Sequence, residues 1–506
     1  MRPDGYQAMT IGRGIRCAAV RAPKKAALVF GEMQFSYQTL VDRIARVGNL
    51  ARDHLGLKEG DRVALLAPNC LPFVEIVAGI SDVGAIVATL SPRLTRSELR
   101  RILDDCTPRV LIAHPDCRSS VDPDWASDIV IVWLDEEYEA LLDCAASLPV
   151  SSTVAEEAPF ALAYTSGTTG LPKGVLLSHR SRAITFMAMA AEYRCFGPDD
   201  NFLALAPMCH GAGFVFACAA LFFGGTTTLF SSADPEMIIT RIGQGDITGV
   251  FMVPTHFARI FDLPGAVLAR HQTHGLQTII SNAAALPQFL KEAAIDHFGD
   301  GLLHETYGST EGGIVTNIRP GDLRRKPGSV GHPFACVEVE LRRSDGTLVD
   351  AGEPGELFCR GPTSFNGYWQ RPIETSETCA YGWVTVGDVA VADAEGFISI
   401  IDRKNDMVVT GGMNVYPREI ENVISSMPGV REVAVVGKVD HEWGERIHAF
   451  IVPISNGAVD AGSVLSLCRD NLAAFKVPRE ITFLSELPRN VGGKVMKTAL
   501  RQSLKA

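Results

Sequence analysis

The sequence lacks paired cysteines. Its twelve cysteines occur as single residues, with no CxxC pair and no His/Cys cluster at the spacing that zinc requires. Paired thiols at such spacings are the usual sign of a zinc site or a redox motif. Their absence argues against those classes, and we interpret the cysteines as reduced, mostly buried thiols of a cytosolic protein.

Long apolar runs and an excess of basic residues are also missing. The most apolar stretch, residues 214–225, is too short to cross a bilayer, and the first residues lack the apolar core of a secretory signal. The final residues, SLKA, are not a peroxisomal address. With 47 basic and 58 acidic side chains the net charge is −11, which disfavours nucleic acid or an anionic membrane as the main partner. We expect a soluble, cytoplasmic protein without a transmembrane segment, in which a local cationic pocket could still bind an anionic small molecule.

The chain is rich in apolar sequence arranged in regular blocks. Its 506 residues are 46% hydrophobic, enough for two or more domains. Strands are expected at residues 62–69 and 85–92, and helices at residues 71–85 and 95–106. This alternation predicts a parallel α/β architecture.

The pattern changes in the second half of the chain. From about Gly328, short runs such as residues 355–361 (GELFCRG) alternate with Gly/Pro turns and predict a β-rich subdomain. Beyond residue 402 the composition predicts a small α+β domain of about one hundred residues. The predicted fold class is therefore α/β, with a large N-terminal domain at residues 1–402 and a small C-terminal domain at residues 403–506.

One loop is unusually rich in glycine and hydroxyl groups. Residues 163–179 (AYTSGTTGLPKGVLLSH) lie between apolar segments that are expected to be strands. Inward-pointing backbone amides, hydroxyls and the Lys173 ammonium together suit polyphosphate oxygens. A flexible Ser/Gly linker is the alternative, but linkers do not lie between apolar strands. The loop is not a Walker motif, because GxxxxGK[ST] does not occur in the chain.

The segment YTSGTTGLPKG resembles the phosphate loop of the adenylate-forming superfamily of acyl-CoA synthetases, luciferases and nonribosomal peptide adenylation domains, and most of all their acyl- and aryl-CoA ligases. Five further family motifs follow in order: PMCHGAGF at 207–214, YGSTE at 307–311, YGWVTVGDVA at 381–390, DRKNDMVVTGGMNVYPREIE at 402–421 and NVGGKVMK at 490–497. The resemblance implies that a carboxylic acid and ATP give an acyl-adenylate and pyrophosphate, and that a thiol then takes the acyl group. The implied cofactors are ATP, Mg²⁺ and coenzyme A.

The resemblance also implies roles for single residues in binding ATP. Tyr307 would offer its ring to adenine, Thr310 a hydroxyl near the α-phosphate, and Glu311 a hard carboxylate ligand for Mg²⁺. Asp388 would accept both ribose hydroxyls, with Arg403 as a second ribose contact. The implied contacts to nucleotide and metal are Thr165, Ser166, Gly167, Thr168, Thr169, Gly170, Lys173, Ala283, Tyr307, Asp388 and Arg403, with Thr169 also near the metal.

The small domain is expected to move between the two half-reactions. Lys494 resembles the lysine that bridges carboxylate and phosphate oxygens during adenylation. Rotation about a hinge at Asn405, where the family usually has Lys or Asp, would withdraw this lysine and admit the thiol. Gly411 and Gly412 would line the thiol tunnel. Weaker candidates for coenzyme A contacts are Arg93, Trp443 and Lys476.

The acid pocket is expected to have apolar walls. Its implied lining is Phe186, Phe214, Phe251, Ala283, Ala284, Gly308 and His210. Gly308 leaves open a space that acetate-type enzymes fill with Trp, and His210 resembles the gate at the pocket mouth. No cation is evident among these residues, which disfavours a second charge on the substrate. We predict a medium-sized hydrophobic or aromatic monocarboxylic acid.

Three hypotheses for the function remain, of which acyl- or aryl-CoA ligase leads. The second is an adenylating enzyme with another acceptor, for carrier-protein loading or as a fatty-acyl-AMP ligase, although the latter carries an insertion that residues 331–355 are too short to contain. Amino-acid adenylation would require an Asp that the HGAGF neighbourhood lacks. The third is a non-catalytic protein on the same fold, which intact Lys173, Glu311, Asp388 and Lys494 disfavour. The sequence does not identify the acid and leaves a homodimer open.

Overall fold

The computed structural model describes residues 7–150, 153–166, 172–231, 234–404, 406–410, 413–441, 443–455, 457–489 and 495–504. The chain divides into two compact units, Met1–Val339 with Cys359–Val384, and Glu340–Phe358 with Thr385–Ala506. The predicted domain boundary between residues 402 and 403 falls inside the second unit and stays a prediction. The predicted α/β fold class is confirmed by the sheets described below.

The first unit contains a seven-stranded sheet. From edge to edge its strands are β18 (Gly367–Tyr368), β8 (Pro172–Ser178), β7 (Pro159–Ser166), β4 (Ile86–Leu90), β3 (Arg62–Leu66), β5 (Val110–Ala113) and β6 (Val130–Trp133). The five strands from β7 to β6 are parallel to one another, and β8 is antiparallel to both of its neighbours, β7 and β18. The alternation predicted for residues 62–106 is confirmed, because β3, α3, β4 and α4 follow one another there.

The same unit contains a nine-stranded sheet. Its order is β15 (His332–Pro333), β14 (Gly313–Ile318), β13 (Leu303–Ser309), β12 (Thr278–Ser281), β11 (Gly249–Met252), β9 (Asn201–Ala204), β10 (Thr226–Leu229), β1 (Ala26–Phe30) and β2 (Met33–Ser36). The strands from β13 to β1 are parallel. The loops after β9, β11, β12 and β13 therefore gather at one edge, which is where open α/β sheets bind ligands.

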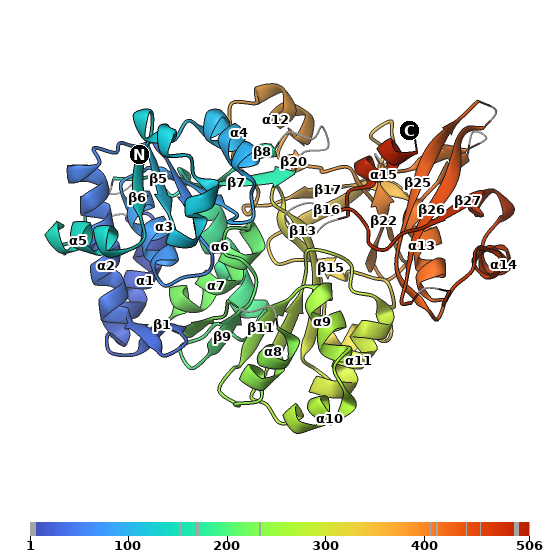
Figure 1. Cartoon of the computed structure of the whole chain (residues 1–506), viewed down its shortest axis with the longest axis horizontal. Helices are drawn as coiled ribbons and strands as arrows, with labels where there is room; N and C mark the ends of the chain where they lie inside the picture. Colours follow the sequence, from blue (N-terminus) through green and yellow to red (C-terminus); the bar gives the residue numbers. More distant parts are fainter. Residues whose placement is uncertain are drawn as a thin grey trace. The chain divides into compact units, whose positions relative to one another are not determined.

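The helices of the first unit are α1 (Ile11–Arg21), α2 (Tyr37–Asn49), α3 (Pro72–Asp82), α4 (Arg96–Cys106), α5 (Glu136–Cys144), α6 (His179–Tyr193), α7 (Gly211–Phe223), α8 (Pro235–Ile242), α9 (Pro254–Phe261), α10 (Gly265–Leu268), α11 (Gln288–Phe298) and α12 (Pro372–Thr378). Helix α6 packs on β8, α7 packs on β9 and β10, and the two helices pack on each other, so they lie between the two sheets (Figure 1). Helix α7 is apolar on all sides and almost wholly buried, as expected of a helix between two layers. None of the helices in the described residues has the length and apolarity to cross a membrane.

Two smaller sheets, built largely from short strands, occupy much of the rest of the described chain. The first unit also holds β19 (Cys379–Ala380) and β20 (Trp383–Val384). Two strands, β16 (Glu338–Arg342) and β17 (Gly355–Arg360), each belong partly to the first unit and partly to the second. The second unit holds β21 (Asp388–Ala392), β22 (Ile398–Arg403), β23 (Val408–Thr410), β24 (Met413–Val415), β25 (Val430–Asp440), β26 (Gly444–Pro453) and β27 (Glu480–Phe483), with helices α13 (Pro417–Ser425), α14 (Ala461–Asn471) and α15 (Lys497–Ser503). Helix α13 packs on β25 and on α14 around an apolar core. This end of the chain has the α+β character that its composition predicts.

Candidate active site

Glu311 lies in the turn between β13 and β14, and its buried carboxylate accepts a hydrogen bond from the Tyr368 hydroxyl at 2.8 Å. Burial, and then the negative charge of Glu311, raise the pKa of Tyr368 above its ordinary value, so the hydroxyl keeps its proton and remains a donor. The Lys173 ammonium lies 5.2 Å from the centre of the Tyr368 ring, and Thr165 is the strand partner of Lys173. The fold thus brings Lys173 close to the tyrosine that holds Glu311 of the YGSTE motif. Sequence reasoning missed Tyr368, because its contact with Glu311 arises only when β18 pairs with β8.

Gly308 is required by a close approach between two backbone segments. A Cβ atom at this position would lie 2.1 Å from the carbonyl oxygen of Gly313. The β13–β14 pairing is irregular between Tyr307 and Gly308, and Thr310 follows β13 directly. A glycine is therefore needed here whatever the size of the acid pocket, since only glycine lacks the Cβ atom.

The loop after β12 contains a strained residue. Ala283 has a φ of 75°, in the left-handed region that residues other than glycine rarely adopt. Its neighbour Asn282 holds the loop, because the side-chain amide donates to the Thr306 hydroxyl at 2.8 Å and the side-chain oxygen accepts from the Ala283 amide. Ala283 and Ala284 are exposed. Both follow β12 on the sheet edge where β13 brings Tyr307.

Asp388 and Arg403 meet in the second unit. They are cross-strand partners in the β21–β22 pairing, and the Arg403 guanidinium donates to the Asp388 carboxylate at 3.1 Å. Asp388 is buried, whereas the Arg403 side chain is half exposed. The two residues that the sequence assigns to the ribose are therefore adjacent.

The candidates for coenzyme A lie on separate elements. Arg93 is exposed just after β4. Lys476 donates to both carboxylate oxygens of Glu419 at 2.7 Å. Trp443 is 41% exposed, and the Arg479 guanidinium lies 5.8 Å from its ring. Of these three, the tryptophan alone presents an open side chain with a cation beside it.

Several predicted residues fall outside the described part of the chain. These are Gly167, Thr168, Thr169, Gly170, Asn405, Gly411, Gly412 and Lys494, and also the side chain of Ser166. Their assigned roles stay predictions.

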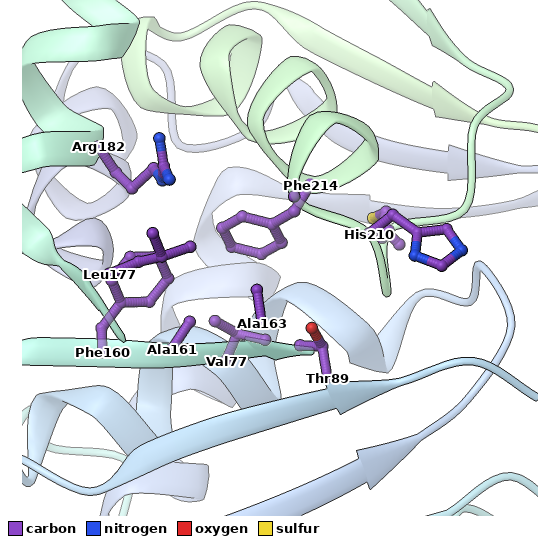
Figure 2. A pocket seen from close by; sticks show the side chains of 11 residues that line it. Val77, Thr89, Phe160, Ala161, Ala163, Leu177, Arg182, His210 and Phe214 are labelled. Atoms are coloured by element: carbon purple, nitrogen blue, oxygen red, sulfur yellow. The ribbon is translucent and has the colours of Figure 1, made fainter. Parts of the chain in front are cut away.

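A small cavity lies in the first unit, beside the strands β4, β7 and β8 and the starts of α6 and α7 (Figure 2). It is lined by Val77, Thr89, Phe160, Ala161, Ala163, Leu177, Arg182, Met208, His210, Gly211 and Phe214. The Thr89 hydroxyl donates to the Cys209 carbonyl at 3.0 Å, which fixes the loop before α7. A Cβ atom at Gly213 would lie 2.1 Å from the Pro207 carbonyl oxygen, so a glycine allows α7 to begin this close to the loop. The motif PMCHGAGF is thereby folded so that His210 and Phe214 border the cavity.

The cavity differs from the acid pocket expected from the sequence. His210 and Phe214 line it, but Phe186 packs against Phe222 with ring centroids 5.3 Å apart, and Phe251 stacks on Phe216 at 4.4 Å. Both phenylalanines are fully buried core residues. A core residue and a cavity wall have the same apolar sequence signature, so the sequence alone did not separate them.

Arg182 also lines this cavity, although no cation was expected in the acid pocket. Nothing in the sequence singled out this residue. Arginine on a helix is usually a solvated charge, and α6 is buried on several sides, so its periodicity does not show which positions face inward.

Comparisons with known proteins identify the family. The family model "AMP-binding enzyme" matches residues 15–369, and the model "AMP-binding enzyme C-terminal domain" matches residues 419–494. The chain therefore belongs to the AMP-binding enzymes, the adenylate-forming superfamily that its six motifs resemble.

The chain is similar to CoA ligases over nearly its whole length. It is 34% identical to feruloyl-CoA synthase of an Amycolatopsis species, with 99% of both chains covered. It is 33% identical to indoleacetate–CoA ligase of Aromatoleum aromaticum, with 95% of both covered. The crystal structure of ATP-bound MatB from Rhodopseudomonas palustris matches with a TM-score of 0.91 at 28% identity, covering 99% of both chains.

The chain is an ATP-dependent acid–CoA ligase of the AMP-forming class. It joins a carboxylic acid to coenzyme A through an acyl-adenylate, with release of pyrophosphate, and its cofactors are ATP, Mg²⁺ and coenzyme A. The leading hypothesis from the sequence is confirmed at this level.

Proposed function

We propose that the enzyme activates a medium-sized carboxylic acid with a hydrophobic or aromatic body. The cavity beside His210 is the observation that carries this proposal. Its walls are mostly apolar side chains, which suits an acid with a hydrophobic or aromatic body. The two relatives above are named for acids that contain an aromatic ring, which supports the same substrate class.

In the adenylation step a carboxylate oxygen of the acid attacks the α-phosphorus of ATP, and pyrophosphate leaves. Lys173 and the donors of the glycine-rich loop neutralise phosphate charge, and Thr310 donates near the α-phosphate. Tyr307 stacks on adenine, while Asp388 with Arg403 binds the ribose. His210 borders the acid at the mouth of the pocket. In the second step the thiol sulfur of coenzyme A attacks the acyl carbon and AMP leaves.

Glu311 would hold Mg²⁺ with Thr169, and the metal would draw charge from the phosphate oxygens. The described residues contain no group of three His, Cys, Asp or Glu side chains able to hold a metal ion. A single carboxylate nevertheless suits Mg²⁺, which is commonly bound through one or two carboxylates together with substrate phosphates and waters. The hydrogen bond from Tyr368 orients the Glu311 carboxylate for this task.

The C-terminal part, residues 403–506, would swing about Asn405 between the two steps. Lys494 acts in adenylation, and Gly412, Trp443, Lys476 and Arg93 contact coenzyme A, although Lys476 must first leave Glu419. We place the enzyme in the cytoplasm, since its twelve cysteines are free, as a reducing compartment requires. A homodimer stays a prediction.

The test is acid-dependent pyrophosphate release, measured with and without coenzyme A over a panel of aromatic and aliphatic acids. We expect release with ring-bearing or medium-chain acids and thioester formation when coenzyme A is present. Glu311→Gln should lose both while its melting curve stays that of the parent. Pyrophosphate release that yields no thioester would indicate another acceptor, and an enzyme that uses only acetate would contradict the proposed substrate class.

A further inference from the structure

Arg182 extends from the first turns of α6 to the wall of the cavity described above. The residue is only 4% exposed. Its Nε atom has no hydrogen-bond partner, and none of the described carboxylates forms an ion pair with its guanidinium. Burial lowers the pKa of Arg182 to about 10, so the group still carries its charge at neutral pH.

The other buried charges in the described residues have partners. Lys291 pairs with Glu305 at 2.5 Å, and Glu75 accepts from Arg43 at 2.6 Å. Proteins pair buried charges because an isolated charge loses its hydration without compensation. An apolar side chain of similar volume would fill the place of Arg182 without this cost. The unpartnered guanidinium beside a cavity therefore points to a partner that arrives as a ligand.

The position of Arg182 in the cavity indicates which part of a ligand it meets. In Figure 2 Arg182 lies on one side of the Phe214 ring and His210 on the other. The neighbouring walls are the apolar side chains of Phe160 and Leu177, and the Thr89 hydroxyl is engaged by the Cys209 carbonyl. An acid whose reacting carboxyl lies near His210 would direct its other end toward Arg182.

We propose that Arg182 binds a second carboxylate of the substrate, so that the enzyme activates a dicarboxylic acid with a hydrophobic or aromatic middle. The guanidinium fork matches the two oxygens of a carboxylate, which gives both charge compensation and a fixed orientation. This inference rests on the proposed function and specifies its substrate. It also explains why an arginine occupies an apolar wall.

The first experiment compares acids that differ at the far end only. Suberate is paired with octanoate, and terephthalate with 4-methylbenzoate, and kcat/KM is measured by acid-dependent pyrophosphate release. The parent enzyme should prefer the diacid of at least one pair. Arg182→Leu should lower kcat/KM for that diacid by about tenfold to hundredfold more than for the monoacid, the scale of a hydrogen bond to a charged group. Arg182→Lys, which keeps the charge but loses the fork, should be intermediate.

Arg180 provides a matched control two residues away on the same helix. Its side chain is 48% exposed and lies 3.5 Å from Glu157. Arg180→Leu should therefore leave the ratio of diacid to monoacid unchanged. If Arg180→Leu changes the ratio as much as Arg182→Leu, the effect comes from surface charge and the proposal is overturned.

Thermal melting gives a readout that does not depend on turnover. Without ligand, Arg182→Leu should melt at a higher temperature than the parent, because an uncompensated buried charge is removed. The preferred diacid alone should raise the melting temperature of the parent and not that of Arg182→Leu.

The outcomes separate the inference from the proposed function. If pyrophosphate release occurs with monoacids and the variant keeps the parent's ratio, the role of Arg182 is wrong while the proposed function stands. If no acid supports release, the proposed function fails, and the melting shift with suberate or terephthalate still decides whether Arg182 binds a carboxylate.

Discussion

Arg43 on α2 and Arg182 on α6 both carry a guanidinium into the interior of the first unit, but their surroundings differ. Arg43 donates to both oxygens of Glu75, at 2.6 and 2.8 Å, and to Glu139 at 2.7 Å. The Tyr138 hydroxyl adds a hydrogen bond to Glu75 at 2.8 Å. Arg182 has no such partner in the described residues and lines a cavity. A charge that the fold neutralises belongs to the structure, whereas a charge left open beside a cavity is available to a ligand.

The largest expected effect is a loss of stability when the ion pair between Arg43 and Glu75 is broken. Arg43→Met leaves the fully buried Glu75 without its ion pair, and removing one partner of a buried pair typically lowers the free energy of unfolding by about 3–5 kcal/mol. Urea denaturation measures this loss, and the activity of the folded enzyme should be unchanged.

Arg100→Met is the matched surface control for Arg43→Met. Arg100 pairs with Asp104 at 2.8 Å, and the two side chains are 40% and 55% exposed. Its loss should be far smaller, because water already screens exposed pairs. Equal losses for the two variants would remove the distinction between buried and exposed arginines.

Lys494 is a cation whose expected partners, the carboxylate and phosphate oxygens of the substrates, are present only during adenylation. Lys494→Ala should slow adenylate formation by about 10² or more, the scale of one positioned electrostatic contact. Synthetic acyl-adenylate and coenzyme A should still give thioester at a rate near that of the parent, because the lysine is expected to be withdrawn in that step. Equal loss of the two half-reactions in a folded variant would contradict domain alternation.

The Tyr368 hydroxyl is an uncharged hydrogen-bond donor to Glu311, the expected Mg²⁺ ligand. Tyr368→Phe removes the 2.8 Å hydrogen bond to Glu311. We expect pyrophosphate release to fall by about tenfold at limiting Mg²⁺, because a hydrogen bond to a charged group is worth roughly 1.5–3 kcal/mol. The difference should narrow as Mg²⁺ is raised. A loss independent of Mg²⁺ would assign Tyr368 to the core rather than to the site.

A buried histidine can release its proton and stay neutral at neutral pH, whereas a buried arginine keeps its charge. Burial lowers the pKa of His304 to about 4 from its ordinary 6.5. Between these values the unfolded chain binds more protons than the folded one, so stability is full above about pH 6.5 and is lost as the pH falls toward 4. His304→Gln should reduce this loss by about 1 kcal/mol for each pH unit below 6, measured by urea denaturation at several pH values. Parallel curves for parent and variant would mean that His304 binds its proton as readily in the folded protein as in the unfolded chain.

Local patterns in the sequence were sufficient to predict much of the fold. Apolar blocks alternate with amphipathic ones at residues 62–106, and the structure has β3, α3, β4 and α4 in that segment. The six motifs identified the family because their order and spacing are properties of the chain itself. Asp388 and Arg403 could be assigned together for the same reason, and they prove to be cross-strand neighbours.

The surroundings of other residues depended on which distant segments of the chain pack together. The sequence interpreted Gly308 as an opening in the pocket, but the backbone at Gly313 also requires a glycine there. Phe186 and Phe251 were expected to line the pocket and instead pack in the core.

The sequence by itself determined the α/β class, the family and the reaction, because periodicity and motif spacing are set along the chain. The tertiary structure alone decided that Tyr368 reaches Glu311 and that Arg182 lines an apolar cavity without a partner. The physical reason is that burial and pairing depend on residues distant in sequence. A lone arginine or tyrosine has the same local signature whether water, a carboxylate or a ligand completes its surroundings.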